Sequence, residues 1–171
     1  VNMDDMYVTV QAGATWADLR AALHPKGVRT PFWGPLSGIS STIGGGLSQQ
    51  NAFFGAGVWG TTSDSVLAVT VVLADGSIVR TGSASTKDAT PFFRNYGPDL
   101  TGIFCGDCGA LGIKAEVTLR LIPEPKYEGW LSFSMPDLPA TARAVASLAR
   151  TNLACEVCAF DPNLAKIRMR R

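Results

Sequence analysis

The stretch Ser41-Thr42-Ile43-Gly44-Gly45-Gly46-Leu47-Ser48 decides the fold assignment, because a glycine triplet here opens what has the form of a short helix. Clustered glycines let backbone N–H groups converge on an anion, and the start of a helix adds its positive end. The triplet is neither a Walker A loop nor a Gly-x-Gly-x-x-Gly turn after a strand. Taken alone, it fits either a ligand contact or a tight helix–sheet crossing.

The segments on either side of the triplet place it in a mixed α and β context. Residues 7–11 alternate and are β-branched, which predicts a strand. A helix follows with Thr15 as N-cap and Lys26-Gly27 at its end, and its apolar face is formed by Trp16, Leu19 and Leu23. Residues 31–59 lose all periodicity, and such a long irregular run inside a compact domain is usually functional.

Further along the chain, residues 66–73 and 77–80 flank Asp75-Gly76 and predict a hairpin with a type I′ turn. Residues 91–104 are rich in aromatic and aliphatic side chains around Gly97-Pro98, which favours two short helices. A glycine-rich turn then leads into a strand over residues 113–122, which ends at Pro123-Glu124-Pro125.

Pro123-Glu124-Pro125 has the composition of a linker and divides the chain into residues 1–125 and 126–171. Beyond it we expect a strand over 130–134, an amphipathic helix over 138–150 and a strand over 153–160. This β-α-β pattern is the expected beginning of a second α+β domain.

Composition excludes several classes of protein. The net charge of +1 carries no electrostatic signature for nucleic acid or an anionic membrane. The basic residues at 166–171 are expected to be a solvated tail. The longest apolar run, residues 66–74, is far shorter than the roughly 20 residues of a membrane span, so we expect a soluble, cytoplasmic protein. Because the sequence starts at Val1 and ends in mid-pattern, it is expected to be a fragment.

Two C-x-x-C pairs, Cys105/Cys108 and Cys155/Cys158, are the sharpest competing signal, since four thiolates can bind a structural zinc. Their wide separation is not that of a zinc ribbon, and positions three apart on a strand point to opposite faces. Buried structural thiols are therefore favoured over a metal site or a redox pair.

Five ordered motifs carry a family resemblance: residues 8–19, 41–45, 59–64, 71–76 and 104–113. In this order they resemble the FAD-binding domain (PCMH type) of the vanillyl-alcohol oxidase and p-cresol methylhydroxylase family. Within it they resemble most the branch of glycolate oxidase, D-lactate dehydrogenase and alkyldihydroxyacetonephosphate synthase. The resemblance covers about residues 8–125 and implies an α+β fold, the second subdomain of the FAD-binding domain. The remainder resembles the start of the substrate-covering cap.

The resemblance implies FAD as the cofactor. The segment at 36–45 would lie along the isoalloxazine and pyrophosphate, and the one at 108–114 near the adenosine and ribityl part. Two residues depart from the family: Cys108 stands where Glu is frequent and Lys114 where Ile or Val is usual. The implied cofactor-binding residues are Leu36, Ser37, Gly38, Ile39, Ser40, Ser41, Thr42, Gly44, Gly45, Gln49, Gln50, Asn51, Ala52, Cys108, Gly109, Ala110, Leu111, Gly112 and Ile113.

The resemblance also implies the remaining partners. A first subdomain with the pyrophosphate loop is expected before Val1, and a 2-hydroxy acid or related alcohol is the expected substrate, oxidised by hydride transfer to flavin N5. No catalytic base is assigned, and His24 is expected to be a surface capping residue. A zinc-stabilised interaction module, a catalytically inactive FAD-binding homologue and a reductase of the cell-wall precursor type remain as alternatives.

Overall fold

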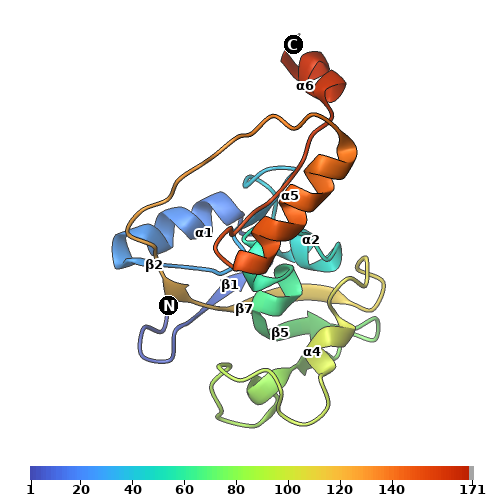
Figure 1. The fold of residues 1–171 in the computed structure, drawn as a ribbon. Helices are drawn as coiled ribbons and strands as arrows, with labels where there is room; N and C mark the ends of the chain where they lie inside the picture. Colours follow the sequence, from blue (N-terminus) through green and yellow to red (C-terminus); the bar gives the residue numbers. More distant parts are fainter. Residues whose placement is uncertain (170–171) are drawn as a thin grey trace.

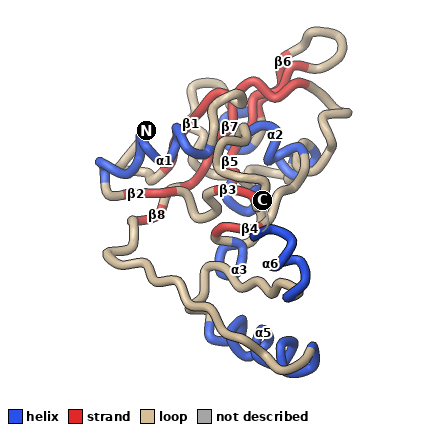
Figure 2. Tube along the Cα trace, turned by 90° about the horizontal axis from the view of Figure 1, so that it is seen from above, coloured by secondary structure: helices blue, strands red, loops and turns tan. Residues whose placement is uncertain are grey.

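The computed structural model describes residues 1–169, and its centre is a four-stranded antiparallel sheet in the order β1-β7-β5-β6 (Figures 1 and 2). Arg170 and Arg171 of the predicted basic tail lie outside the described residues. The strands are β1 (Tyr7–Gln11), β2 (Val28–Arg29), β3 (Gly34–Pro35), β4 (Phe53–Phe54), β5 (Val66–Val72), β6 (Ile78–Arg80), β7 (Ile113–Arg120) and β8 (Ile122–Pro123). The α-helices are α1 (Trp16–Leu23), α2 (Ile43–Ser48), α3 (Ala56–Trp59), α4 (Leu100–Ile103), α5 (Leu138–Thr151) and α6 (Pro162–Met169), with short 3₁₀ turns at His24–Lys26, Thr62–Ser65 and Gly82–Ser85.

The long strands pair over most of their length. Tyr7 faces Arg120 and Gln11 faces Glu116 across the β1–β7 pair, while β5 runs antiparallel to β7 with two register shifts. Thr9 and Thr118 hydrogen-bond through their hydroxyls at 2.9 Å on one face of the sheet. Val8, Val117 and Leu119, the neighbours of these threonines along the strands, point to the opposite, apolar face of the sheet.

Helices α1 and α2 cover this apolar face and form the core with it. The predicted face of α1 is buried, and Ile43 and Leu47 of α2 have no exposed surface. The helix cap is as predicted: the Thr15 hydroxyl accepts the Asp18 N–H, and Gly27 adopts a left-handed conformation at the end of the following turn. The core side chains are Val8, Trp16, Leu19, Leu23, Val28, Phe32, Ile43, Leu47, Val66, Val69, Val71, Phe104, Val117, Leu119 and Leu121.

The β5–β6 hairpin is present, but its turn is not of type I′. Only Gly76 of the two central residues has a positive φ, of 82°. The Gly76 N–H instead donates to the Leu73 carbonyl, and Asp75 accepts the backbone N–H and the hydroxyl of Ser77. Asp75 thereby organises the turn through its side chain and needs no left-handed backbone of its own.

A buried hydroxyl pair fastens α4 to the sheet. The Thr81 hydroxyl accepts the Val69 N–H at 3.0 Å and lies 2.7 Å from the Thr101 hydroxyl. Thr81→Val is expected to lower the free energy of unfolding by about 1–3 kcal/mol, because it leaves a buried N–H without a partner. Chemical denaturation measures this loss, and an unchanged unfolding midpoint would contradict it.

Three predicted features between 91 and 160 are wrong. Only one short helix, α4, forms between residues 91 and 104, where two were expected, and the segments 130–134 and 153–160 are irregular rather than strands. A strand needs a neighbour for its N–H and C=O groups, and within residues 1–169 neither segment is paired with one. The amphipathic helix at 138–150 is confirmed as α5.

Polar contacts tie residues 126–169 to the rest of the chain, and Figure 2 shows α5 at the edge of the molecule, away from the four-stranded sheet. Glu128 pairs with Arg29 at 2.7 Å and with Arg20 at 3.7 Å. The Gly57 N–H donates to the Cys155 carbonyl at 2.9 Å. Most large apolar side chains of this part remain exposed, including Tyr127 at 92%.

Candidate functional site

A shallow groove with a volume of about 360 Å³ lies where α2, the turn after β1 and the loop before β7 meet. Four of its lining residues are glycines of the triplet segment and of the later loop. The remaining residues come from the turn, from the end of α2 and from the start of β7. The lining is Ala12, Gly13, Gly44, Gly45, Ser48, Gly109, Gly112, Ile113 and Lys114.

The glycine triplet makes a close crossing between α2 and the turn after β1. A Cβ on Gly44 would lie 2.7 Å from the Cβ of Ala12, and one on Gly46 would lie 3.2 Å from Nε1 of Trp16. The amides of the triplet are already bonded: Gly44 to the Ala12 carbonyl, Gly45 to the Thr42 hydroxyl and Gly46 to the Thr42 carbonyl. The triplet amides are therefore not free to converge on an anion, and of the two alternatives the tight crossing is the one present: the triplet shapes the groove by allowing close packing.

The loop at residues 36–42 lies against the start of α1 rather than in the groove. The first two amides of α1, those of Trp16 and Ala17, donate to the carbonyls of Ser41 and Ile39 at 3.2 and 2.7 Å. These contacts satisfy N–H groups that a helix start leaves unpaired. The loop is thus fixed by α1, while Leu36 at its beginning is 54% exposed.

The glycine-rich loop at residues 106–112 forms the opposite wall and is built around Asp107. Oδ1 of Asp107 accepts the Gly109 N–H at 3.0 Å and lies 2.6 Å from Nζ of Lys114, while Oδ2 accepts the Leu111 N–H at 3.4 Å. Burial raises the pKa of Asp107, but the hydrogen bond from Lys114 and those from the loop outweigh it and hold the pKa below its ordinary value. The carboxylate is therefore charged at neutral pH.

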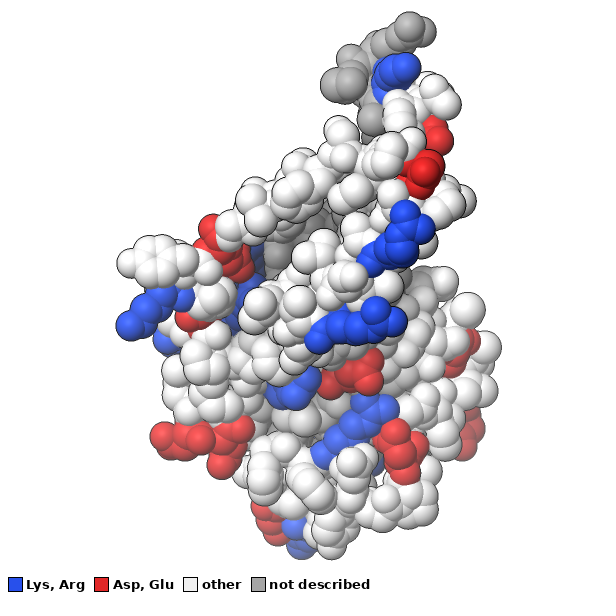
Figure 3. All heavy atoms as spheres, in the orientation of Figure 1, with Lys and Arg blue, Asp and Glu red and all other residues white. Residues whose placement is uncertain are grey.

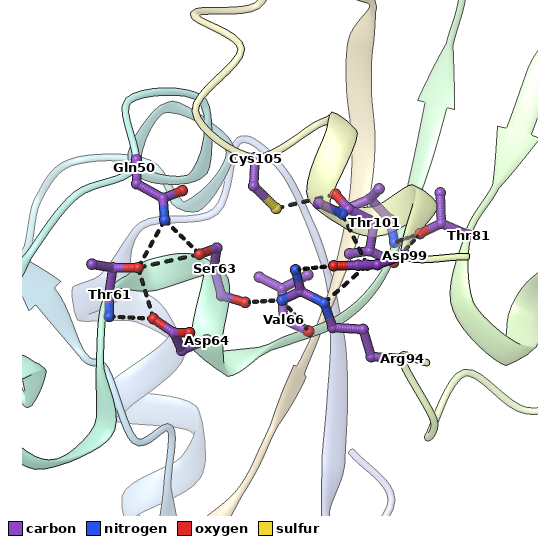
Figure 4. A network of polar contacts seen from close by, with 12 residues as sticks. Gln50, Thr61, Ser63, Asp64, Val66, Thr81, Arg94, Asp99, Thr101 and Cys105 are labelled. Atoms are coloured by element: carbon purple, nitrogen blue, oxygen red, sulfur yellow. Dashed lines mark hydrogen bonds and ion pairs between the residues drawn. The ribbon is translucent and has the colours of Figure 1, made fainter. Parts of the chain in front are cut away.

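A polar network joins the end of α2 to the segment that leads into this loop (Figure 4). The Gln50 amide donates to the hydroxyls of Thr61 and Ser63 at 2.9 and 2.6 Å. The Ser63 carbonyl accepts a hydrogen bond from the Arg94 guanidinium, which in turn holds both oxygens of Asp99.

Asp99 caps α4, and the Cys105 thiol beyond it donates to the Thr101 carbonyl. Two backbone bonds complete the connection, from the amides of Gly106 and Cys108 to the carbonyls of Leu47 and Ser48. The two walls of the groove are thus one connected unit.

The groove brings together only part of the predicted cofactor-binding set. Gly44, Gly45, Gly109, Gly112 and Ile113 line it. The other predicted residues, those at 36–42 and 49–52 with Cys108, Ala110 and Leu111, lie outside its lining and remain predictions. Sequence reasoning missed Ala12, Gly13 and Ser48; the Ala-Gly turn directly after the first strand was the signal for two of them.

The four cysteines are free thiols; Cys105 and Cys155 are half-buried, whereas Cys108 and Cys158 are exposed, so the prediction of buried thiols is wrong for the last two. Burial raises the pKa of Cys105 to about 11, so this thiol is protonated at neutral pH. Cys155 lies 3.9 Å from the Arg29 guanidinium near the linker. Among residues 1–169, no group of three or more His, Cys, Asp and Glu side chains is placed to hold a metal ion. His24 is exposed, as expected, and pairs with Glu124 at 2.8 Å.

Comparison with known proteins identifies a family for the first half of the chain. Residues 1–82 match a family described as FAD binding domain. Residues 1–82 belong to this FAD-binding domain family.

Relatives extend the similarity beyond those residues. The chain is 33% identical to the glycolate oxidase subunit GlcD of Bacillus subtilis over 86% of its length, which is 30% of that relative. It is 29% identical to the mitochondrial D-lactate dehydrogenase [cytochrome] 1 of Saccharomyces cerevisiae over 95% of its length, 26% of that relative. It is 34% identical to the mitochondrial D-lactate dehydrogenase [cytochrome] of Arabidopsis thaliana over 74%, 21% of that relative. The chain therefore spans less than a third of the length of these relatives.

The groove of the FAD-binding domain fits part of an FAD. A Cβ on Gly13 or Gly109 would meet nothing within 4 Å, so at these two positions the chain leaves space that a side chain would fill. The volume lies at the small end of the range for ligand sites, which suits one portion of an extended dinucleotide. The residues that would hold this portion are those lining the groove.

The face of the molecule drawn in Figure 3 carries charges of both signs. In Figure 3 the acidic and basic side chains are interspersed over the visible face. Among the described residues, the helices are all too short or too polar to cross a lipid bilayer.

Proposed function

We propose that the protein carrying this chain is an FAD-dependent oxidoreductase that oxidises a 2-hydroxy acid or a related alcohol. The observation that supports it best is the glycine-lined groove between α2 and residues 109–112, found in a chain with an FAD-binding domain. The names of the relatives, a glycolate oxidase subunit and D-lactate dehydrogenases, favour 2-hydroxy acids as the substrate class.

The described residues have a binding and orienting role in this proposal. When bound, FAD would accept the hydride equivalent from the α-carbon of the substrate. Because Gly44 has no side chain, α2 packs closely on Ala12, and the cofactor could approach the backbone of both segments. The loop around Asp107 forms the second wall. The residues at 36–42 and 49–52 are proposed to extend the contact along the flavin beyond the groove.

Residues 126–169 are proposed to begin the domain that covers the substrate. The exposure of Trp130, Leu131 and Phe133, at 69%, 84% and 68%, is in keeping with a segment that packs against further parts of the same protein. The domain boundary near residue 125 and a cytoplasmic location remain predictions.

The test is reduction of the flavin by substrate in the whole natural protein. Purified protein is mixed without oxygen with a panel of D- and L-2-hydroxy acids, and the visible absorbance of the bound flavin is followed. The proposal expects bleaching by at least one acid or related alcohol. Protein that retains FAD but is bleached by none of them would support the inactive homologue instead.

A further inference from the structure

We propose that the buried Asp107–Lys114 ion pair positions the wall of the FAD groove, so that FAD affinity depends on it. The inference rests on the proposed cofactor site. It concerns Asp107, to which the sequence analysis gave no role, and Lys114, which stands where the related family usually has Ile or Val.

Both charged side chains are almost completely removed from water. The Lys114 and Asp107 side chains are 3% and 1% exposed, and Nζ and Oδ1 are 2.6 Å apart. Such a pair adds little to the free energy of folding, because the desolvation of two charges offsets much of their attraction. Its position favours a local role: Lys114 lines the groove at the start of β7, and Asp107 lies within the wall itself.

The wall needs an anchor because its glycines are conformationally free and its Cys108 has a left-handed backbone. Gly106, Cys108 and Gly109 have φ values of 70°, 52° and 79°, and Gly112 has 156°. A left-handed Cys108 is unfavourable and persists only when surrounding contacts fix it, whereas the glycines adopt these angles without strain and could adopt many others. The segment at 106–112 would otherwise sample many conformations.

Two sets of contacts fix this backbone. The beginning of the loop is held by α2, through the bonds of Gly106 and Cys108 to the Leu47 and Ser48 carbonyls. The middle is held by Asp107, which bonds the amides of Gly109 and Leu111. Among residues 1–169, Lys114 is the one cation bonded to this carboxylate, and it ties the loop to the sheet. Removal of either charge therefore frees the part of the wall that faces the groove.

The test measures FAD affinity and loop order in the whole natural protein. The variants are Lys114→Met, Asp107→Asn and the double variant with both changes. FAD binding is titrated to the apo-protein, the unfolding temperature is recorded, and hydrogen exchange reports on the Gly109 and Leu111 amides. Thr81→Val is the control, since it loses a buried hydrogen bond away from the groove.

Each single variant is expected to bind FAD at least about tenfold more weakly, a change of about 1.4 kcal/mol, with faster exchange in the loop. The double variant is expected to regain much of the unfolding temperature, because no charge is left buried without a partner. Its FAD affinity stays low, because the tie to the sheet is still missing. Thr81→Val lowers the unfolding temperature and leaves FAD affinity unchanged.

Folded single variants that bind FAD within about twofold of the natural protein would overturn the inference, as would unchanged exchange of the loop amides. A double variant with natural affinity would show that the pair acts through stability alone and would also overturn it. Failure of the unmodified protein to bind FAD would refute the proposed function instead, and the exchange measurement would still decide whether the pair holds the loop.

Discussion

Gly13→Leu is expected to reduce FAD affinity by at least about 100-fold, or about 2.7 kcal/mol, while the unfolding temperature stays close to that of the natural protein. Gly13 lines the groove, and a Cβ there meets nothing within 4 Å. Its φ is not positive, so a larger residue strains neither the backbone nor the core. The leucine side chain therefore occupies space that the cofactor would take. Titration of the apo-protein with FAD, alongside thermal unfolding, measures both quantities.

Gly129→Leu is the matched control for this substitution. Gly129 also has open space around it and no positive φ, but it lies in the segment after the linker and does not line the groove. It is expected to leave FAD affinity unchanged. Gly13→Ala is expected to fall between the natural protein and Gly13→Leu. Natural affinity in a folded Gly13→Leu protein would mean that FAD does not use this groove.

Gly55→Ala is expected to lower the free energy of unfolding by about 4 kcal/mol or more, enough to prevent folding in a protein of ordinary stability. The added Cβ would lie 2.2 Å from the Pro31 carbonyl oxygen and 3.2 Å from the Phe32 Cα. Both are backbone atoms of a segment whose Phe32 side chain is fully buried, so they have no room to move. The φ of 97° adds strain for any residue with a Cβ.

Gly13→Ala adds the same methyl group in open space and is the comparison for this effect. Denaturant unfolding of the two variants gives the difference directly. A Gly55→Ala protein that loses less than about 1 kcal/mol would show that the approach of residues 31–32 to Gly55 is looser than described.

The local elements with strong sequence signals were predictable. The alternation of residues 7–11, the Thr15 cap and the Asp75-Gly76 hairpin each depend on a few neighbouring residues, and all three are confirmed. The turn type was wrong because the Asp75–Ser77 hydrogen bonds compete with a left-handed backbone at Asp75, and the dipeptide alone does not reveal them. Segments 130–134 and 153–160 have strand-like composition, but pairing depends on partners distant in the sequence.

The site was only partly predictable for a similar reason. The glycines at 44, 45, 109 and 112 were found, because a ligand approach and a close chain crossing both favour glycine. The sequence does not show that the triplet amides are bonded to Ala12 and Thr42, since this depends on where the turn after β1 packs. The pairing of Lys114 with Asp107, seven residues earlier, was not predictable either, because it depends on the loop folding back on itself.

The measurement that tests the central claim most directly is the FAD content of the whole natural protein, produced with FAD supplied. Flavin is released by denaturation and quantified against protein by its absorbance. The groove and the family predict yellow protein with one FAD for each chain, and a lower FAD content in Gly13→Leu. Natural protein that is colourless and free of FAD under these conditions would contradict the assignment.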